Sequence, residues 1–174
     1  MTPPFEQSML PHLDAAYNLA RWLLRNEQDA RDSVQEAYLR AFKAYAGFRG
    51  GDGRAWLLTI VRNVCYSHLR RVRRDQPPET FDEARHGPVN DSAEAAARLR
   101  REIDRERLEA ALAALPDEMR EVLVLHELEG LSYKEIAAVG GIPLGTVMSR
   151  LARARLRLQR ALQQLIAQEE SHGL

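Results

Sequence analysis

Residues 144–160 carry five arginines and no acidic side chain. At 100° per residue, the polar groups of this stretch gather on one side of a helix, namely Thr146, Ser149, Arg150, Arg153, Arg157 and Arg160. A guanidinium binds a phosphate or the edge of a guanine through two parallel hydrogen bonds. Because a solvated surface helix usually mixes both signs of charge, this face favours contact with nucleic acid over a plain solvated surface.

The residues around this face predict a helix-turn-helix. Ser132 and Glu135 have the spacing of a capping box, which starts a short helix, and Gly140-Gly141 can end that helix in a left-handed turn. Pro143 suits the first position of a second helix. That helix has an apolar stripe for packing, made of Leu144, Val147, Leu151, Ala154, Leu158, Leu162 and Leu165. The arginine face then lies on the helix that such motifs insert into a DNA major groove.

Charge is segregated along the chain, although 25 basic and 25 acidic residues give a net charge of zero. Six arginines and no acid lie between Arg54 and Arg74. Acids gather at Asp29, Asp32 and Glu36, and again from Glu102 to Glu135. The segregation predicts basic surfaces for nucleic acid and an acidic surface for another partner.

Several functions are disfavoured by composition. The single cysteine, Cys65, forms no internal disulfide and is expected to be a small buried hydrophobe, while the five histidines lack metal-ligand spacing. The glycine-rich loop 47–53 lacks the order and the lysine of phosphate-binding loops. No nucleophile–base pair supports an enzyme. We therefore expect no metal, cofactor or small-molecule substrate, and the lack of a signal peptide or apolar span predicts a cytoplasmic chain without membrane insertion.

Hydrophobic periodicity predicts helices throughout and no strand. The expected fold is all-α, with two small helical domains at 1–74 and 93–174 joined by a flexible, proline-rich linker at 75–92. The first domain is expected to hold a helix from Phe5 to Arg25, a helix capped by Asp29 and a helix from Ala55 to Arg74. The second is expected to begin with a helix from Ala93 to Leu115 and one from Pro116 to about Gly130, ahead of the helix-turn-helix.

The helix after Asp29 is strongly amphipathic. One side is expected in the core and contains Val34, Ala37, Tyr38, Ala41, Phe42 and Tyr45. The opposite side contains Asp32, Gln35, Glu36, Leu39, Arg40 and Lys43. The acids Asp32 and Glu36 either stabilise the positive N-terminus of the helix or contact a partner, and physical chemistry alone does not separate the two interpretations.

Four segments, 34–45, 48–63, 115–137 and 141–158, together resemble bacterial sigma factors of the extracytoplasmic function group. They read VQEAYLRAFKAY, FRGGDGRAWLLTIVRN, LPDEMREVLVLHELEGLSYKEIA and GIPLGTVMSRLARARLRL. The resemblance implies a transcription initiation subunit, often serving a stress response, that binds core RNA polymerase and promoter DNA. It also implies control by an anti-sigma factor.

The resemblance implies three sets of site residues. Polymerase binding falls on Asp32, Gln35, Glu36, Leu39 and Arg40. Contact with the melted −10 strand, including a flipped base, falls on Phe48, Arg49, Arg54, Arg62, Asn63, Ser67, Arg70 and Arg71. Recognition of the −35 duplex falls on Thr146, Ser149, Arg150, Arg153 and Arg157.

Two departures from the family pattern bear on promoter preference. Met148 stands where several relatives have arginine, and the loop between Phe48 and Trp56 is about one residue shorter than in some relatives. The alternative function is a stand-alone dimeric helix-turn-helix regulator. It accounts for the arginine face, but it gives no role to the acidic amphipathic helix or to the glycine-rich loop.

Overall fold

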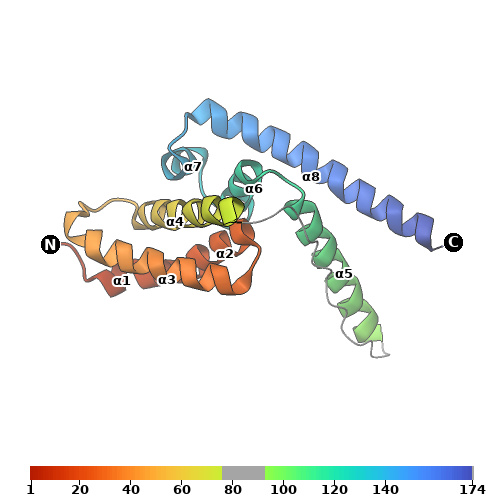
Figure 1. Ribbon diagram of the computed structural model, residues 1–174, viewed down its shortest axis with the longest axis horizontal. Helices are drawn as coiled ribbons and strands as arrows, with labels where there is room; N and C mark the ends of the chain where they lie inside the picture. Colours follow the sequence, from red (N-terminus) through yellow and green to blue (C-terminus); the bar gives the residue numbers. More distant parts are fainter. Residues whose placement is uncertain (76–92, 174) are drawn as a thin grey trace.

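A computed structural model describes residues 1–75 and 93–173, with the side chains of 93–100 excepted. The N-terminal half contains α1 (Phe5–Met9), the 3₁₀ turn η1 (Leu10–His12), α2 (Leu13–Leu24), α3 (Glu27–Ala44), the 3₁₀ turn η2 (Tyr45–Gly47) and α4 (Gly53–Asp75). The C-terminal half contains α5 (Ala93–Ala113), α6 (Asp117–Leu123), the π-helical turn η3 (Val124–Leu128), α7 (Tyr133–Gly140) and α8 (Leu144–His172). Within these ranges no strand occurs, and the predicted all-α class is confirmed (Figure 1).

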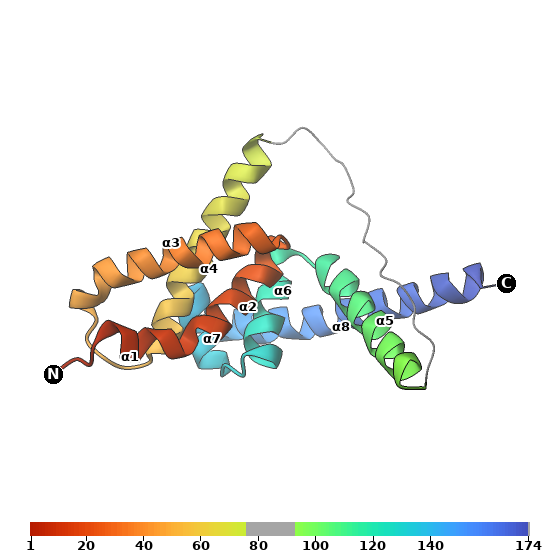
Figure 2. The same ribbon diagram turned by 90° about the horizontal axis from the view of Figure 1, so that it is seen from below.

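Three helices, α2, α3 and α4, pack against one another and form the core of the N-terminal half (Figure 1). Their contact faces are fully buried at Leu19, Ala37, Leu57 and Val61. Each buried leucine contributes about 1.5–3 kcal/mol through removal of apolar surface from water, so the fold of this half follows from its amphipathic stripes. Figure 2 shows the last turns of α4 extending beyond α2 and α3, and Arg70, Arg71 and Arg74 in these turns are exposed.

The single helix predicted from Phe5 to Arg25 is divided into α1, η1 and α2. Pro11 causes the division, because proline has no backbone N–H to donate and its ring clashes with the preceding helical turn. The predicted cap of α3 was also wrong. Asn26 is the N-cap, and its side chain accepts a hydrogen bond from the backbone N–H of Asp29 at 2.9 Å.

The beginning and end of α4 also differ slightly from the prediction. The helix begins at Gly53, two residues earlier than expected, because the Asp52 carboxylate accepts a hydrogen bond from the backbone N–H of Ala55 at 3.0 Å. It ends at Asp75, the first residue assigned to the linker. The rest of that segment, 76–92, lies outside the described residues.

An aromatic cluster fixes the loop that joins α3 to α4. Tyr45 stacks on Phe48 with ring centroids 5.7 Å apart, and Phe48 lies 4.9 Å from Trp56. The Tyr45 hydroxyl donates to a backbone carbonyl near the N-terminus and lies 2.7 Å from the Ser8 hydroxyl. Phe42 differs from the prediction, since it is 60% exposed although its periodicity placed it in the core. Its neighbour Ala41, which is buried, closes the core at that level of α3.

The helix-turn-helix follows its sequence signals closely. Ser132 and Glu135 form both hydrogen bonds of the capping box, and Gly141 ends α7 with a left-handed φ of 62°. Pro143 precedes the first helical residue of α8 instead of occupying it. The apolar stripe of α8 is buried at Val147, Leu151 and Ala154, whereas Leu144 is 45% exposed in the first turn. The later turns of α8 contact α5, which crosses them in Figure 2. Leu162 and Leu165 in these turns are half-buried.

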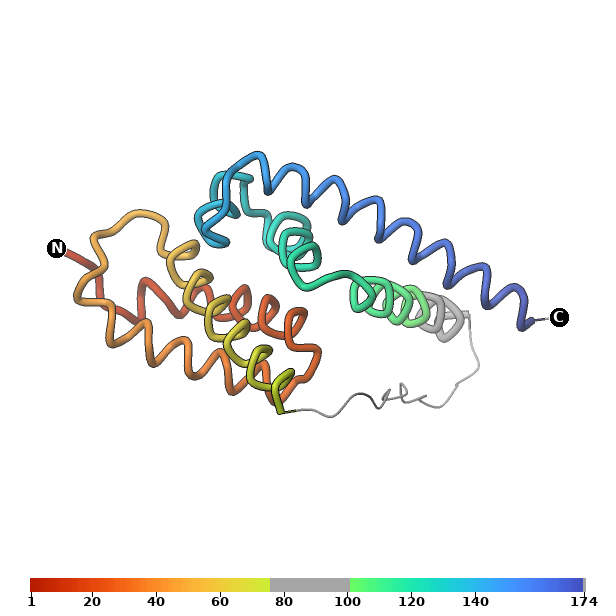
Figure 3. Tube along the Cα trace, turned by 45° about the horizontal axis from the view of Figure 1, so that its top comes forward, coloured from red at the N-terminus to blue at the C-terminus, as the bar shows by residue number. Residues whose placement is uncertain are grey.

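The two halves lie side by side and contact each other (Figure 3). Helix α7 packs on α4, and α6 packs on α2. Buried residues of both halves belong to one continuous hydrophobic cluster, which includes Leu57 and Val61 on one side and Val122 and Ile136 on the other. The sequence does not predict how the two halves pack together. This packing determines how accessible the candidate site residues are.

Cys65 is fully buried in α4, as predicted, and gives a direct test of this packing. Burial, with the nearby Glu121 carboxylate, raises the pKa of the thiol to about 12. Because the thiolate is the reactive form, iodoacetamide at pH 8 should modify the native protein at least about 100-fold more slowly than the urea-unfolded protein. Mass spectrometry measures the two rates of modification. Equal rates in the native and the unfolded protein would contradict the burial of Cys65.

Candidate nucleic-acid interface

The first four turns of α8 carry the residues expected to read duplex DNA. Arg153 and Arg157 are exposed, and among the described residues neither makes an ion pair. Arg150 is half-buried, and its guanidinium lies 3.4 Å from the Glu118 carboxylate. Thr146 and Ser149 are also half-buried, and the Ser149 hydroxyl donates to the Thr146 carbonyl at 3.1 Å. Among the arginines expected to read the −35 duplex, Arg153 and Arg157 are therefore the most accessible.

Two apolar side chains share the exposed start of this helix. Met148 is 52% exposed and Leu144 is 45% exposed. An apolar side chain in a major groove contacts the thymine methyl group rather than a hydrogen-bonding edge. The exposed surface of α8 therefore carries both apolar side chains and guanidinium groups that can contact DNA.

The last turns of α4 form a second basic surface. Arg70 and Arg71 are exposed, and with Arg73 and Arg74 they line a shallow depression beside Ser67. Arg70 donates to the Ser67 hydroxyl at 3.2 Å. Asn63, one turn earlier, is also exposed. Four of the side chains expected to contact the −10 strand, Asn63, Ser67, Arg70 and Arg71, thus lie towards one end of α4.

The first turns of α4 are covered by the C-terminal half. Arg54 donates to the Glu129 carbonyl at 3.1 Å and to the Glu135 carboxylate at 3.3 Å. Arg62 donates to the Glu121 carboxylate, and its guanidinium lies 4.4 Å from the centre of the Tyr66 ring. Both arginines were expected to contact a DNA strand, and in this structure both contact protein acids.

The loop before α4 is shaped by two glycines. Gly50 and Gly51 have φ values of 85° and 95°, which residues other than glycine rarely adopt. Arg49 is exposed beside them, whereas Phe48 is half-buried in the aromatic cluster. The loop therefore carries an exposed guanidinium, that of Arg49, and an aromatic ring, that of Phe48, which already stacks on Tyr45.

The polar side of α3 is a separate surface. Asp32, Gln35, Leu39 and Arg40 are exposed there, and Glu36 is half-buried in an ion pair with Arg40. Leu39 is 57% exposed and lies beside the exposed Phe42, which sequence periodicity assigned to the core. A polar surface with two neighbouring large apolar side chains is typical of a protein contact.

A buried carboxylate that the sequence analysis missed lies between the two halves. Glu121 is 2% exposed, and it accepts hydrogen bonds from the Arg62 Nε and, at 2.8 Å, from the Tyr66 hydroxyl. Burial raises the pKa of the Glu121 carboxyl, while these two donors act against that rise. Burial, with the neighbouring carboxylate, also raises the pKa of Tyr66. An acid within the apolar run of α6 was the available signal, but its partners are 55 and 59 residues away.

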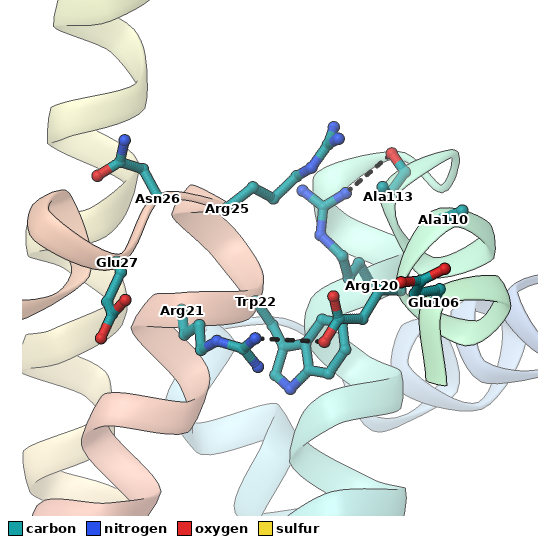
Figure 4. A pocket seen from close by; sticks show the side chains of 10 residues that line it. Arg21, Trp22, Arg25, Asn26, Glu27, Glu106, Ala110, Ala113 and Arg120 are labelled. Carbon is teal, nitrogen blue, oxygen red and sulfur yellow. Dashed lines mark hydrogen bonds and ion pairs between the residues drawn. The ribbon is translucent and has the colours of Figure 1, made fainter. Parts of the chain in front are cut away.

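A cleft lies between α2 and the start of the C-terminal half, and it is lined by both basic and acidic side chains (Figure 4). Its wall contains Arg21, Arg25 and Arg120, balanced by Glu27, Glu106 and Glu109. Arg120 is buried and donates to the Leu115 carbonyl at 3.0 Å and to the Asp117 carboxylate, and burial lowers its pKa. Since these contacts fasten the end of α5 to α6, the arginine has a structural role.

Within residues 1–75 and 93–173, no cluster of three or more histidine, cysteine or acidic side chains is placed to bind a metal ion. None of the helices in the described ranges has the length and apolar character needed to cross a membrane.

Comparison with known proteins agrees with this geometry. Residues 9–75 match the family described as Sigma-70 region 2, and residues 105–158 match Sigma-70, region 4. The chain is 34% identical over 171 residues to the RNA polymerase sigma-H factor of Pseudomonas aeruginosa, covering 93% of this chain and 88% of that protein. It is 35% identical over 161 residues to the ECF RNA polymerase sigma factor SigE of Mycolicibacterium smegmatis, covering 90% of this chain but 61% of that protein.

A solved structure gives the same result for the fold. The sigma factor RpoE of Bartonella quintana, crystallised with the anti-sigma factor NepR, superposes with a TM-score of 0.74 and 32% identity. The match covers 91% of this chain and 96% of that one. Fold and surfaces together define a two-part helical transcription factor with a C-terminal helix-turn-helix. The chain belongs to the RNA polymerase sigma factors, in the extracytoplasmic function (ECF) group.

Proposed function

We propose that this chain is the promoter-specificity subunit of a bacterial RNA polymerase. It binds the core enzyme, directs it to promoters and helps to separate the −10 strands, while the polymerase supplies all the catalysis. The observation that carries the proposal is the occurrence of both sigma regions, in order, on one chain. The chain then acts in the cytoplasm, with neither enzymatic activity nor a cofactor of its own.

The work is divided between two parts of the chain. Residues 1–74 bind core polymerase through Asp32, Gln35, Glu36, Leu39 and Arg40, and bind the −10 strand through the α4 surface and the loop before it. Residues 93–174 bind the −35 duplex through Thr146, Ser149, Arg150, Arg153 and Arg157. The exposure of the α3 surface and of the α8 arginines supports this division.

Gel filtration with bacterial core RNA polymerase tests the proposal against its alternative. We expect stable co-elution of the chain with the core enzyme. A stand-alone regulator would instead bind a palindromic duplex as a dimer and elute apart from the polymerase. Tight dimeric binding of that kind, without polymerase association, would replace the proposal with the alternative.

The charged residues of the α3 surface are expected to guide association. Replacing Asp32→Ala together with Glu36→Ala should weaken core binding about three- to tenfold, mainly through slower association, since rim charges steer encounter more than they hold a complex. The effect should shrink at high salt because exposed charges are screened. Surface plasmon resonance at two salt concentrations measures both effects, and an unchanged association rate would remove these acids from the interface.

An anti-sigma factor is the expected regulator. The similar sigma factor of Bartonella quintana was crystallised with its anti-sigma factor NepR, which supports the same mode of control here. Affinity purification of the chain from its own cells should then recover a small protein besides polymerase subunits. Recovery of polymerase subunits alone would count against this control.

A further inference from the structure

The first two turns of α8 present an apolar surface to solvent. Their exposed residues are Leu144, Gly145 and Met148, and the side chains of Leu144 and Met148 are 45% and 52% exposed. Met148 lies one helical turn after Leu144, and the exposed Ala152 lies one turn after Met148. Because residues four apart share one side of a helix, these three form a continuous exposed apolar stripe.

The polar side chains of the same turns are already engaged. Thr146, Ser149 and Arg150 are half-buried. The Ser149 hydroxyl donates to the Thr146 carbonyl at 3.1 Å, and the Arg150 guanidinium lies 3.4 Å from the Glu118 carboxylate. The start of α8 therefore offers a partner mainly apolar contacts, and the first exposed guanidinium of the helix is that of Arg153 in the third turn.

Gly145 is not explained by the packing of the chain itself. Its φ is not positive, and a Cβ atom built there would lie more than 4 Å from its non-local neighbours in the described part of the chain. Glycine within a helix is unfavourable relative to alanine. With the small Ala152 beside it, Gly145 leaves the Met148 side chain projecting from the helix, where an external surface can approach it closely.

The charge around the exposed apolar stripe indicates that this surface is DNA. Residues 144–160 carry five arginines and no acid. Leu144 and Met148 are separated by roughly 6 Å along the helix axis, which is close to the rise of two base pairs, about 7 Å. The apolar group that a major groove presents is the C5-methyl of thymine, which cytosine lacks. Two neighbouring base pairs are thus within reach of the stripe.

We infer that the exposed apolar stripe of α8 reads thymine methyl groups, with Met148 as the specificity-determining contact. This inference rests on the proposed binding of the −35 duplex by α8. The −35 element of this chain then contains a thymine opposite Met148, beside the base pair that Arg153 contacts. At that thymine, preference comes from the methyl group and not from a hydrogen-bonding edge.

The test removes single methyl groups from the DNA. Core RNA polymerase carrying the full chain selects its −35 element from a randomised duplex, and each thymine of that element is then replaced by deoxyuridine. This replacement deletes the C5-methyl and keeps every hydrogen-bonding group. At one thymine it should weaken binding about fourfold, as expected for burial of one methyl group. In Met148→Ala the same replacement should have no effect.

Two further variants serve as controls. Met148→Leu keeps an apolar side chain of similar volume and should retain the methyl effect. Ile166→Ala removes an apolar side chain that is 44% exposed farther along α8, and it should also retain the effect. A selected −35 element without thymine would overturn the inference. A methyl effect of equal size in the unmodified chain and in Met148→Ala would overturn it as well.

A protein contact of the exposed apolar stripe is distinguished by titration of core RNA polymerase without DNA. Met148→Ala should bind the core enzyme like the unmodified chain. Weaker binding of this variant to the core enzyme would assign the stripe to a protein partner and overturn the inference. Failure of the unmodified chain to direct polymerase to any duplex would overturn the proposed function instead.

Discussion

Leu39→Asp should raise the dissociation constant for core RNA polymerase at least tenfold. Leu39 and Phe42 are 57% and 60% exposed on α3, next to the polar residues assigned to polymerase binding. Apolar side chains at the centre of an interface carry most of its binding energy, commonly about 2 kcal/mol or more for a single residue. A carboxylate at that point would be buried without a partner on binding, which adds a further penalty.

The matched control is Ile166→Asp, which makes the same kind of change at a side chain 44% exposed on α8. Titration of fluorescently labelled core enzyme measures both variants, and circular dichroism verifies that both are folded. The control should bind the core enzyme like the unmodified chain. Equal weakening of the two variants, or none in Leu39→Asp, would remove this surface of α3 from the polymerase interface.

Arg153→Ala should weaken binding to a −35 duplex by about 1–3 kcal/mol, or roughly 5- to 150-fold. Arg153 is exposed on α8, and among the described residues no acid is paired with it, so its guanidinium is free to bind a guanine edge. If Arg153 reads a base, the loss should be concentrated at one position of the site. Binding to a library of duplexes that vary one base at a time measures this.

Arg155→Ala is the control for that measurement. Arg155 is two residues away on the same helix, and its guanidinium lies 2.7 Å from the Glu127 carboxylate within the C-terminal half. Its replacement should have little effect on DNA affinity. A uniform loss on all sequences in Arg153→Ala would make it a phosphate contact, since such contacts carry no base preference.

The elements that sequence predicted best are those specified by residues close together in the chain. The capping box of Ser132 and Glu135 needs only four consecutive residues, and Gly141 ends α7 through its own backbone freedom. The core face of α3 was right at Val34, Ala37 and Ala41 for the same reason. Local physical rules suffice wherever partner and signal lie within one or two helical turns.

The sequence predictions are wrong where two local signals compete. They are also wrong where the apolar stripe of a helix continues beyond the core. Both Asn26 and Asp29 can cap a helix, and the chain uses the earlier residue. Pro11 interrupts a periodic pattern that otherwise continues through it. Phe42 and Leu144 satisfy the period of their helices, yet they are 60% and 45% exposed. Phe42 has an edge-on contact with the Phe5 ring of α1, with ring centroids 5.3 Å apart. Periodicity gives the direction of a side chain but not the extent of the core.

The site was predictable only in part. Sequence placed the arginines on α4 and α8 and the acids on α6 and α7, and it indicated that the acids serve another partner. It gave no means to pair Arg62 with Glu121, 59 residues away, because this contact depends on how the two halves pack. The roles of the individual site residues remain predictions, and the variants described here test them.

Transcription in a purified system shows whether the chain directs RNA polymerase to specific promoters. Core RNA polymerase is incubated with promoter-bearing fragments from the source genome, with and without this chain, and the 5′ ends of the transcripts are mapped. We expect specific transcription starts that require the chain and that share −35 and −10 elements upstream. Identical transcripts with and without the chain, under conditions in which the chain is folded, would contradict its role as a promoter-specificity subunit.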